Sequence, residues 1–324
     1  MKSCWIVTKD HKAVLEWRDI PVPQPKDGEI VLKVHATALN RGEIVVGGVV
    51  HGGPEKLGGN EAAGVITAVG AGVTQFKPGD KVFGRVRGGF AEYAIAPAHQ
   101  ILPLPACLSF EQAASIPVSF LTAYEMIYPP YGKLKAGEWL LITGVSSGAG
   151  AACVQIAKAL GAKTIGTSGS AEKLEKLKAI GLDVAINTRK PDFAAKVREI
   201  TGSKGVDLAI NLVGGTLFGE CMKCLARKGR LAVVGYVDGA LTAEIDLSAV
   251  HANRFEIFGI SNSKITQEER KAAVAGFARD VMPAIDDGRI VPLVDRVFDF
   301  ADLQAAKDCM ESSAMAGKIV VRVQ

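Results

Sequence analysis

Residues 139–167 predict a strand, a glycine-rich turn, a helix and a second strand, reading WLLIT, GVSSGAG, AACVQIAKALGA and KTIGT. The turn contains Gly144, Gly148 and Gly150. Glycines let the backbone turn sharply and let phosphate oxygens come close, and a helix that begins near Ala149 directs free N–H groups at an anion. Apolar residues recur at helical spacing, and Gly161 can end the helix in the left-handed conformation. The segment predicts a βαβ unit that binds a dinucleotide pyrophosphate; a βαβ turn that binds nothing is the alternative.

The end of the second strand indicates which dinucleotide binds. An NAD site has Asp or Glu about twenty residues beyond the glycines. That point falls on the Thr-Ser-Gly-Ser stretch at 167–170, with no acid before Glu172. We therefore predict NADPH rather than NADH, with Ser168, Lys173 and Arg189 near the 2′-phosphate, because hydroxyls and cations suit a phosphate. In the alternative interpretation the last serine only caps the next helix and the lysine lies on its solvated face; both can hold together.

Composition limits the class of protein. A length of 324 residues suggests about two domains, and 48% hydrophobic with 22% charged residues is typical of a globular protein. A net charge of +4 indicates neither a nucleic-acid nor a membrane surface. We expect no signal peptide and no membrane span, since no apolar run is long enough. The six scattered cysteines favour free thiols, and hence a cytoplasmic protein.

The pattern of expected strands and helices changes once along the chain. Residues 1–121 contain short strands punctuated by glycine and proline, which predicts a compact, mostly antiparallel β-unit. Residues 122–261 alternate apolar strands with helices, in the rhythm of a doubly wound sheet. The predicted strands are 139–143, 163–167, 184–187, 207–213, 230–235 and 256–261. The remaining residues, 262–324, are too few for a domain, so we expect them to join the N-terminal unit.

Several ordered motifs carry a family resemblance over nearly the whole chain. They are GGNEAAGVITAVGAGVTQFKPGDKVFG, GGFAEYAIA, AASIPVSFLTAYEMI, the GVSSGAG turn and the terminal GKIVV. Together they resemble the medium-chain dehydrogenase/reductase superfamily, most closely its zinc-free quinone oxidoreductase branch. The resemblance implies an α/β fold, with a GroES-like β-domain plus a doubly wound Rossmann domain and with cofactor and substrate in the cleft between them. It also implies a homodimer joined through the edges of the Rossmann sheets.

The sequence departs from the zinc-dependent members of this superfamily. Those members carry a catalytic Cys where this chain has Leu39-Asn40-Arg41, and a Gly-His-Glu where it has Gly59-Asn60-Glu61. They also insert a four-cysteine loop where only residues 85–88 lie here. Zinc needs His, Cys or carboxylate ligands from at least three positions. We therefore expect no catalytic and no structural zinc.

The resemblance also implies roles for individual residues. It places Asn40 and Thr122 beside the nicotinamide as the catalytic residues. For cofactor binding it points to Ser146, Ser147, Gly148, Ala149, Asn211, Gly235, Tyr236, Ser261 and Lys318. The first four form the pyrophosphate turn, the next three lie at the carboxyl ends of the fourth and fifth strands, Ser261 ends the sixth strand, and Lys318 lies near a cofactor phosphate. The segment directly after Asn40, RGEIVVGGVV, has no Tyr, whereas several quinone reductases have one there that lines the substrate site.

The sequence therefore predicts an NADPH-dependent, zinc-independent oxidoreductase that transfers a hydride to a small-molecule acceptor, a quinone or an activated enone. One alternative is an alkenal or enoyl-thioester double-bond reductase on the same scaffold. Another is an NADPH-binding protein with a structural or RNA-binding role. His51, in a glycine-rich loop, is a possible substrate contact or acid. The pair Cys221 and Cys224 is better explained as core thiols on a helix than as a zinc or redox motif.

Overall fold

The computed structural model describes residues 1–10, 12–44, 55–262 and 264–324, so His51 lies outside the described residues. Contacts divide the chain into two units. The first unit comprises Met1–Ser119, Arg270–Gly288 and Pro292–Gln324. The second comprises Phe120–Glu269 and Arg289–Val291. The first unit contains two sheets and the second contains one, and each unit has its own buried core.

The second unit is built on a parallel six-stranded sheet. Its strands are β9 (Trp139–Thr143), β10 (Lys163–Ser168), β11 (Val184–Asn187), β12 (Val206–Asn211), β13 (Leu225–Val233) and β14 (Glu256–Gly259). Their spatial order is β11-β10-β9-β12-β13-β14, and every neighbouring pair is parallel. Numbered along the chain this is the order 3-2-1-4-5-6, which defines a doubly wound Rossmann sheet.

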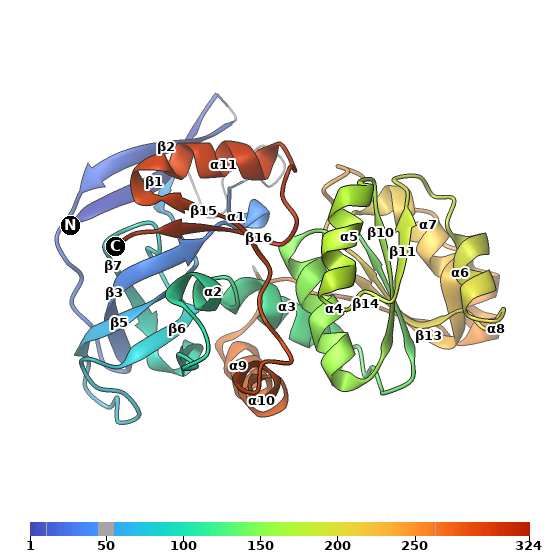
Figure 1. Ribbon diagram of the computed structural model, residues 1–324, viewed down its shortest axis with the longest axis horizontal. Coiled ribbons are helices and arrows are strands. Elements are labelled where there is room, and N and C mark those ends of the chain that lie inside the picture. Colours follow the sequence, from blue (N-terminus) through green and yellow to red (C-terminus); the bar gives the residue numbers. More distant parts are fainter. Residues whose placement is uncertain (11, 45–54, 263) are drawn as a thin grey trace. The chain divides into compact units, whose positions relative to one another are not determined.

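Helices cover both faces of this sheet. They are α4 (Gly148–Leu160), α5 (Ala171–Ala179), α6 (Ala194–Ile200), α7 (Gly215–Cys224) and α8 (Leu247–Asn253). Figure 1 shows α4 and α5 on one face and α6, α7 and α8 on the other. Cys221 and Cys224 belong to the core on the α7 face, and both are 0% exposed. Both thiols therefore pack in the core, as predicted. Burial also raises the pKa of Cys224 to about 12.

Three predicted strands end earlier in the structure than the sequence suggests. β12 stops at Asn211 rather than at residue 213, because the Asn211 side chain accepts the N–H groups of Val213 and Gly214 and turns the chain. β14 stops at Gly259 rather than at residue 261. β13 stops at Val233 rather than at residue 235, and it also begins earlier than predicted, at Leu225 rather than at residue 230, with an irregularity in its pairing with β12 before the main register.

The first unit is mainly antiparallel. One sheet has the order β15-β16-β3-β5-β6-β8 with β7 also paired to β3, and a smaller sheet has the order β2-β1-β4. The strands are β1 (Lys2–Lys9), β2 (Lys12–Asp19), β3 (Glu29–Ala38), β4 (Glu55–Leu57), β5 (Glu61–Val69), β6 (Lys81–Arg85), β7 (Tyr93–Pro97), β8 (Ile101–Pro103), β15 (Val294–Asp299) and β16 (Lys318–Arg322). The C-terminal β16 pairs with β3, which brings residues about 280 positions apart in the sequence into one sheet.

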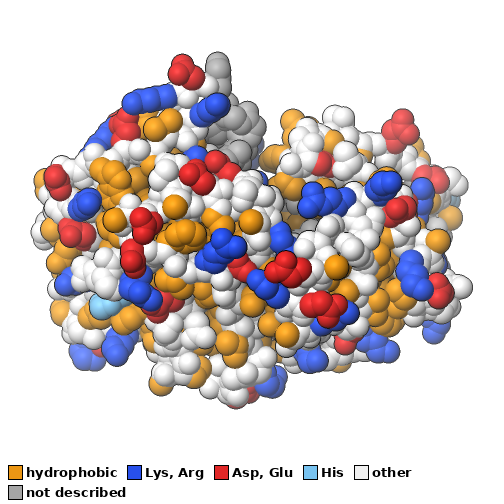
Figure 2. Space-filling model, turned by 45° about the horizontal axis from the view of Figure 1, so that its top comes forward, with side chains coloured by type: hydrophobic (Ala, Val, Ile, Leu, Met, Phe, Trp, Pro, Cys, Tyr) orange, Lys and Arg blue, Asp and Glu red, His pale blue; other side chains and the backbone are white. Residues whose placement is uncertain are grey.

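Short helices complete the first unit. They are α1 (Arg41–Ile44), α2 (Phe110–Ala114), α10 (Met282–Asp286) and α11 (Leu303–Glu311). α3 (Pro117–Ile127) and α9 (Gln267–Asp280) each continue from one unit into the other. No helix among the described residues is long and apolar enough to cross a bilayer. Figure 2 shows Lys and Arg side chains interspersed with Asp and Glu over the face drawn, in keeping with the small net charge.

Candidate active site

The predicted glycine turn joins β9 to α4. Gly144 has a φ of +62°, a conformation that suits glycine, and directly follows β9. Ser147 caps α4, because its hydroxyl accepts the N–H of Gly150 at 3.1 Å. A Cβ on Gly150 would lie 2.5 Å from the carbonyl oxygen of Val145, so the turn can close this tightly only with glycine there. Gly161, with a φ of +83°, ends the helix as predicted.

The turn leaves backbone donors for an anion. Across the described part of the chain, the N–H groups of Gly148 and Ala149 have no acceptor, and both lie in the first turn of α4. This is the positive end of the helix dipole. The Ser146 hydroxyl lies 3.3 Å from the Ser168 hydroxyl, which connects the turn to the end of β10. These groups fit a pyrophosphate and its neighbouring ribose.

Ser168 and Arg189 come together at the end of β10. A Cβ on Gly169 would overlap the Arg189 side chain, so this side chain lies directly against the glycine backbone. Within the described ranges no carboxylate pairs with the Arg189 guanidinium. Ser170 caps α5 by accepting the N–H of Lys173 at 3.4 Å, as the alternative interpretation of the sequence expected. Ser168 takes no part in this cap.

The carboxyl ends of β12 and β13 carry three further candidates. Asn211 is 0% exposed, and its Oδ1 accepts from the Thr143 hydroxyl and from two backbone N–H groups while its Nδ2 donates to the Gly214 carbonyl. Asn211 thus builds the turn, and in the described structure the second N–H of its Nδ2 is the side-chain group left for a cofactor. A Cβ on Gly235 would lie 2.9 Å from the Leu212 carbonyl oxygen, and Tyr236 is 53% exposed.

Thr122 is linked to the end of β14. It lies on α3 with 7% of its surface exposed, and its hydroxyl accepts from Asn262 Nδ2 at 2.7 Å. Ser261, the residue before Asn262, is exposed. Asn262 was not predicted from the sequence, although its place just past the end of a parallel strand is where ligands bind in such sheets.

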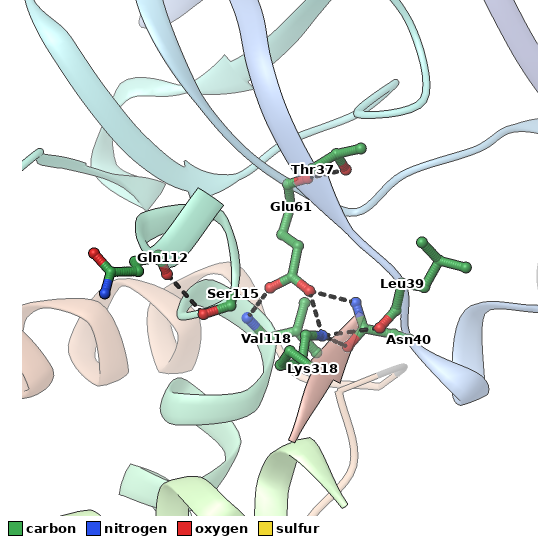
Figure 3. Close-up of polar contacts among 8 residues, drawn as sticks. All are labelled: Thr37, Leu39, Asn40, Glu61, Gln112, Ser115, Val118 and Lys318. Atoms are coloured by element: carbon green, nitrogen blue, oxygen red, sulfur yellow. Dashed lines mark hydrogen bonds and ion pairs between the residues drawn. The ribbon is translucent and has the colours of Figure 1, made fainter. Parts of the chain in front are cut away.

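In the first unit, Asn40 belongs to a buried polar network with Glu61 and Lys318 (Figure 3). Asn40 follows β3, Glu61 begins β5 and Lys318 begins β16. Asn40 Nδ2 donates to Glu61 Oε1 at 2.7 Å, and Lys318 Nζ donates to the same oxygen at 2.7 Å and to Asn40 Oδ1 at 2.8 Å. The third Lys318 donor goes to the Leu39 carbonyl at 2.9 Å. The phosphate contact that the resemblance implies for Lys318 stays a prediction, and it would require one of these bonds to break.

Glu43 is a second buried carboxyl in the same unit. It lies in α1 with 3% exposure, and its Oε1 accepts the N–H of Gly59 at 2.6 Å. Its Oε2 has no partner in the described structure. Burial is the main cause that raises the pKa of Glu43 to about 7. No sequence signal pointed to this group, since a single Glu in a short helix is ordinarily solvated.

The described residues hold no group of three or more His, Cys, Asp or Glu side chains placed to hold a metal ion. Asn60 and Asn40 supply amides, which are poor zinc ligands. Glu61, the one carboxylate in that stretch, is already held by Asn40, Lys318 and the N–H of Val118. The residues present therefore do not fit a zinc site at this position.

Known proteins resemble the chain over both units. Residues 26–106 match the family model of the alcohol dehydrogenase GroES-like domain, and residues 148–279 match that of the zinc-binding dehydrogenases. Human quinone oxidoreductase is 31% identical over 309 residues, covering 94% of this chain and 92% of that protein. The structure of Escherichia coli quinone oxidoreductase complexed with NADPH has a TM-score of 0.87 at 27% identity, and a mycobacterial protein complexed with NADPH has 0.87 at 28%; each covers 100% of both chains.

The strand order, the glycine turn and these matches define a two-domain α/β oxidoreductase with a GroES-like domain and a Rossmann domain. The chain belongs to the medium-chain dehydrogenase/reductase superfamily, in its quinone oxidoreductase branch. The predicted family and fold class are confirmed.

Proposed function

We propose that this enzyme transfers a hydride from NADPH to quinones or other activated enones, without zinc. The observation that carries the proposal is how the Asn40 amide is held. Its Nδ2 donates to Glu61 and its Oδ1 accepts from Lys318, so one N–H group remains to donate to an acceptor. A zinc-dependent dehydrogenase uses a Lewis acid to polarise a carbonyl. Here a fixed amide takes that place, and an amide stabilises much less negative charge than a metal ion.

The residues of the second unit fit NADPH. The free N–H groups of Gly148 and Ala149 suit the pyrophosphate, and Ser168 with Arg189 suits the 2′-phosphate. Thr122 and Ser261 are the candidates at the nicotinamide end. The two neighbours crystallised with NADPH support this choice of cofactor. When bound, the cofactor supplies the hydride.

The chain's own residues then orient the acceptor and stabilise its charge. We propose that Asn40 donates a hydrogen bond to the acceptor oxygen as negative charge develops there. We propose that the proton that completes the reduction comes from water or from a ribose hydroxyl, because in the described residues the Asn40 side chain bonds Glu61 and Lys318 and no tyrosine. One neutral donor suffices only when the reduced anion is delocalised, as in a quinone or a conjugated carbonyl. Simple alcohols and ketones should be poor substrates.

Steady-state NADPH oxidation tests this function with a matched panel of quinones, enals, enoyl thioesters and simple ketones. The proposal predicts that quinones and small conjugated carbonyls are reduced and that the ketones are not. Turnover restricted to enoyl thioesters would instead favour the double-bond reductase. Tight NADPH binding with no turnover of any acceptor would favour a non-catalytic role and contradict the proposal.

We also propose that the enzyme is a homodimer joined at the edge of the Rossmann sheet. β14 is the last strand in the sheet order, and an unpaired edge strand is a template for another strand. Apolar side chains are exposed on β14 and on the segment from β13 to α8, among them Ile257 (38%), Leu247 (72%) and Leu241 (76%). Light scattering should give twice the mass of 34.1 kDa, and Ile257→Lys should shift it toward the monomer. A wild-type mass of one chain would contradict the proposal.

We further propose that the enzyme works in the cytoplasm. All six cysteines are free in the structure, and Cys4, Cys153, Cys221 and Cys224 are buried. Free thiols are typical of a reducing compartment. Fractionation of the source cells would test this, and recovery from a secreted fraction would contradict it.

A further inference from the structure

We infer that Glu61 and Lys318 act as a positioning pair that fixes which way the Asn40 amide faces, leaving one of its N–H groups for an acceptor oxygen. The inference rests on the role of Asn40 in the proposed function. Neither Glu61 nor Lys318 is placed to touch the acceptor, because their side chains are 0% and 5% exposed. They act through Asn40, which is only partly buried.

The ammonium of Lys318 determines the position of the amide oxygen. An ammonium carries three donors and no acceptor. The three go to the carbonyl of Leu39, the carboxylate of Glu61 and the side chain of Asn40. The Asn40 atom that faces Lys318 must therefore be Oδ1.

The carboxylate of Glu61 determines the position of the amide nitrogen. An ionised carboxylate only accepts hydrogen bonds. Its Oε2 accepts the N–H of Val118 at 2.7 Å, and its Oε1 accepts from Lys318 and from Asn40. The Asn40 atom that faces Glu61 must therefore be Nδ2. Turning the amide over would place its NH₂ against an ammonium and its oxygen against a carboxylate. Both charged groups therefore exclude the flipped orientation of Asn40 (Figure 3).

This arrangement leaves one donor. The amide nitrogen has two N–H groups, of which one bonds Glu61. The second is the group that can meet an acceptor oxygen. A buried ion pair adds little net stability compared with apolar residues of similar volume. The ion pair orients the Asn40 amide, which an apolar pair could not do.

The test variant carries both Glu61→Gln and Lys318→Met, which removes the ion pair without leaving an isolated buried charge. The new amide oxygen can still accept from Val118, so its NH₂ group faces Asn40 and favours the reversed orientation. We expect kcat with a quinone to fall by about 100-fold, the lower end of the usual loss for one oxyanion donor, with NADPH affinity unchanged. The matched control is Lys307→Met with Glu311→Gln, which removes another ion pair of a buried lysine from the first unit and should leave kcat unchanged.

A double-mutant cycle separates positioning from a general structural effect. If the pair acts through Asn40, the same two substitutions should lower kcat no further in an Asn40→Ala background. Losses that multiply in that background would show that the pair acts independently of Asn40 and would overturn the inference.

A second readout does not depend on turnover or on the Glu61→Gln, Lys318→Met variant folding. In nuclear magnetic resonance spectra of the wild-type protein, Asn40→Ala identifies the two side-chain N–H signals of Asn40. One should exchange slowly with solvent, because it bonds the buried carboxylate, and the other rapidly. Equal exchange of the two protons would overturn the inference even in an active enzyme. Absence of turnover with every acceptor would instead overturn the proposed function and leave the exchange test in place.

Discussion

The Arg189 side chain lies directly against the backbone of Gly169, where a Cβ would overlap it. Gly169 follows β10, and Arg189 comes two residues after the end of the neighbouring β11. A cation is therefore held at the strand end where an NAD site has an acid. We propose that this pairing of a small residue with a guanidinium selects NADPH.

Arg189→Ala should weaken NADPH binding by about 10- to 100-fold, because a hydrogen bond to a charged group contributes about 1.5–3 kcal/mol. NADH lacks the 2′-phosphate, so its affinity should not change. Fluorescence titration of both nucleotides measures this difference. The control is Lys190→Ala, which removes an exposed neighbouring cation and should have a small effect. Equal losses for NADPH and NADH would contradict the assignment.

Gly150→Ala tests the glycine turn. The added Cβ would lie 2.5 Å from the carbonyl oxygen of Val145, so the turn must open, which should destabilise the protein by about 1–3 kcal/mol. NADPH and NADH should both bind more weakly, since both use the pyrophosphate site. Gly219→Ala on α7 is the matched control: it has open space around its Cβ and should stabilise the protein by about 0.5–1 kcal/mol. Thermal unfolding and titrations with NADPH and NADH measure these effects in the two variants. Normal binding of both nucleotides to the Gly150 variant would contradict this account of the turn.

The raised pKa of Glu43 predicts that the free energy of unfolding depends on pH. Its pKa rises from 4.5 to about 7 on folding, so the folded protein binds more protons than the unfolded chain between these values. Its contribution to the free energy of unfolding should therefore fall as pH rises from about 4.5 to about 7, and stay constant above, by roughly 3 kcal/mol in all.

Glu43→Gln should remove this dependence and keep an acceptor for the N–H of Gly59. The variant should gain stability relative to wild type at pH 8 compared with pH 5, as measured by urea unfolding. Glu244→Gln, at an exposed position, is the control. The same difference between variant and wild type at both pH values would show that Glu43 does not ionise as described.

Zinc independence has its own measurement. Tag-free protein should contain far less than one zinc per chain, and a chelator should not change turnover, because Asn40 and Asn60 stand where zinc ligands would be needed. Stoichiometric zinc with chelator-sensitive turnover would contradict the account and favour an alcohol dehydrogenase.

Local sequence was enough to predict the cofactor half of the fold. β9 and β11 have the predicted bounds, and β10 is one residue longer. The turn and helix α4 were readable because glycine spacing and apolar periodicity act over a few residues. Strand ends were less readable: Val213 looks like strand sequence, but the Asn211 side chain captures its N–H.

The polar network around Asn40 was not predictable from local sequence. Lys318 is 257 positions from Glu61 in sequence, and only the pairing of β16 with β3 and of β3 with β5 brings them together. The resemblance supplied Asn40 but suggested a different partner for Lys318. Burial of Glu43 likewise depends on packing that no single motif encodes.

The most direct test of the central claim is single-turnover reduction of a quinone by NADPH in metal-free wild-type enzyme and in Asn40→Ala. The account predicts that the wild type reacts without metal, and that the variant is slower by about 10²–10³, the usual loss for one oxyanion donor, with unchanged NADPH affinity. Full activity of the variant, or wild-type reaction only after zinc is added, would contradict it.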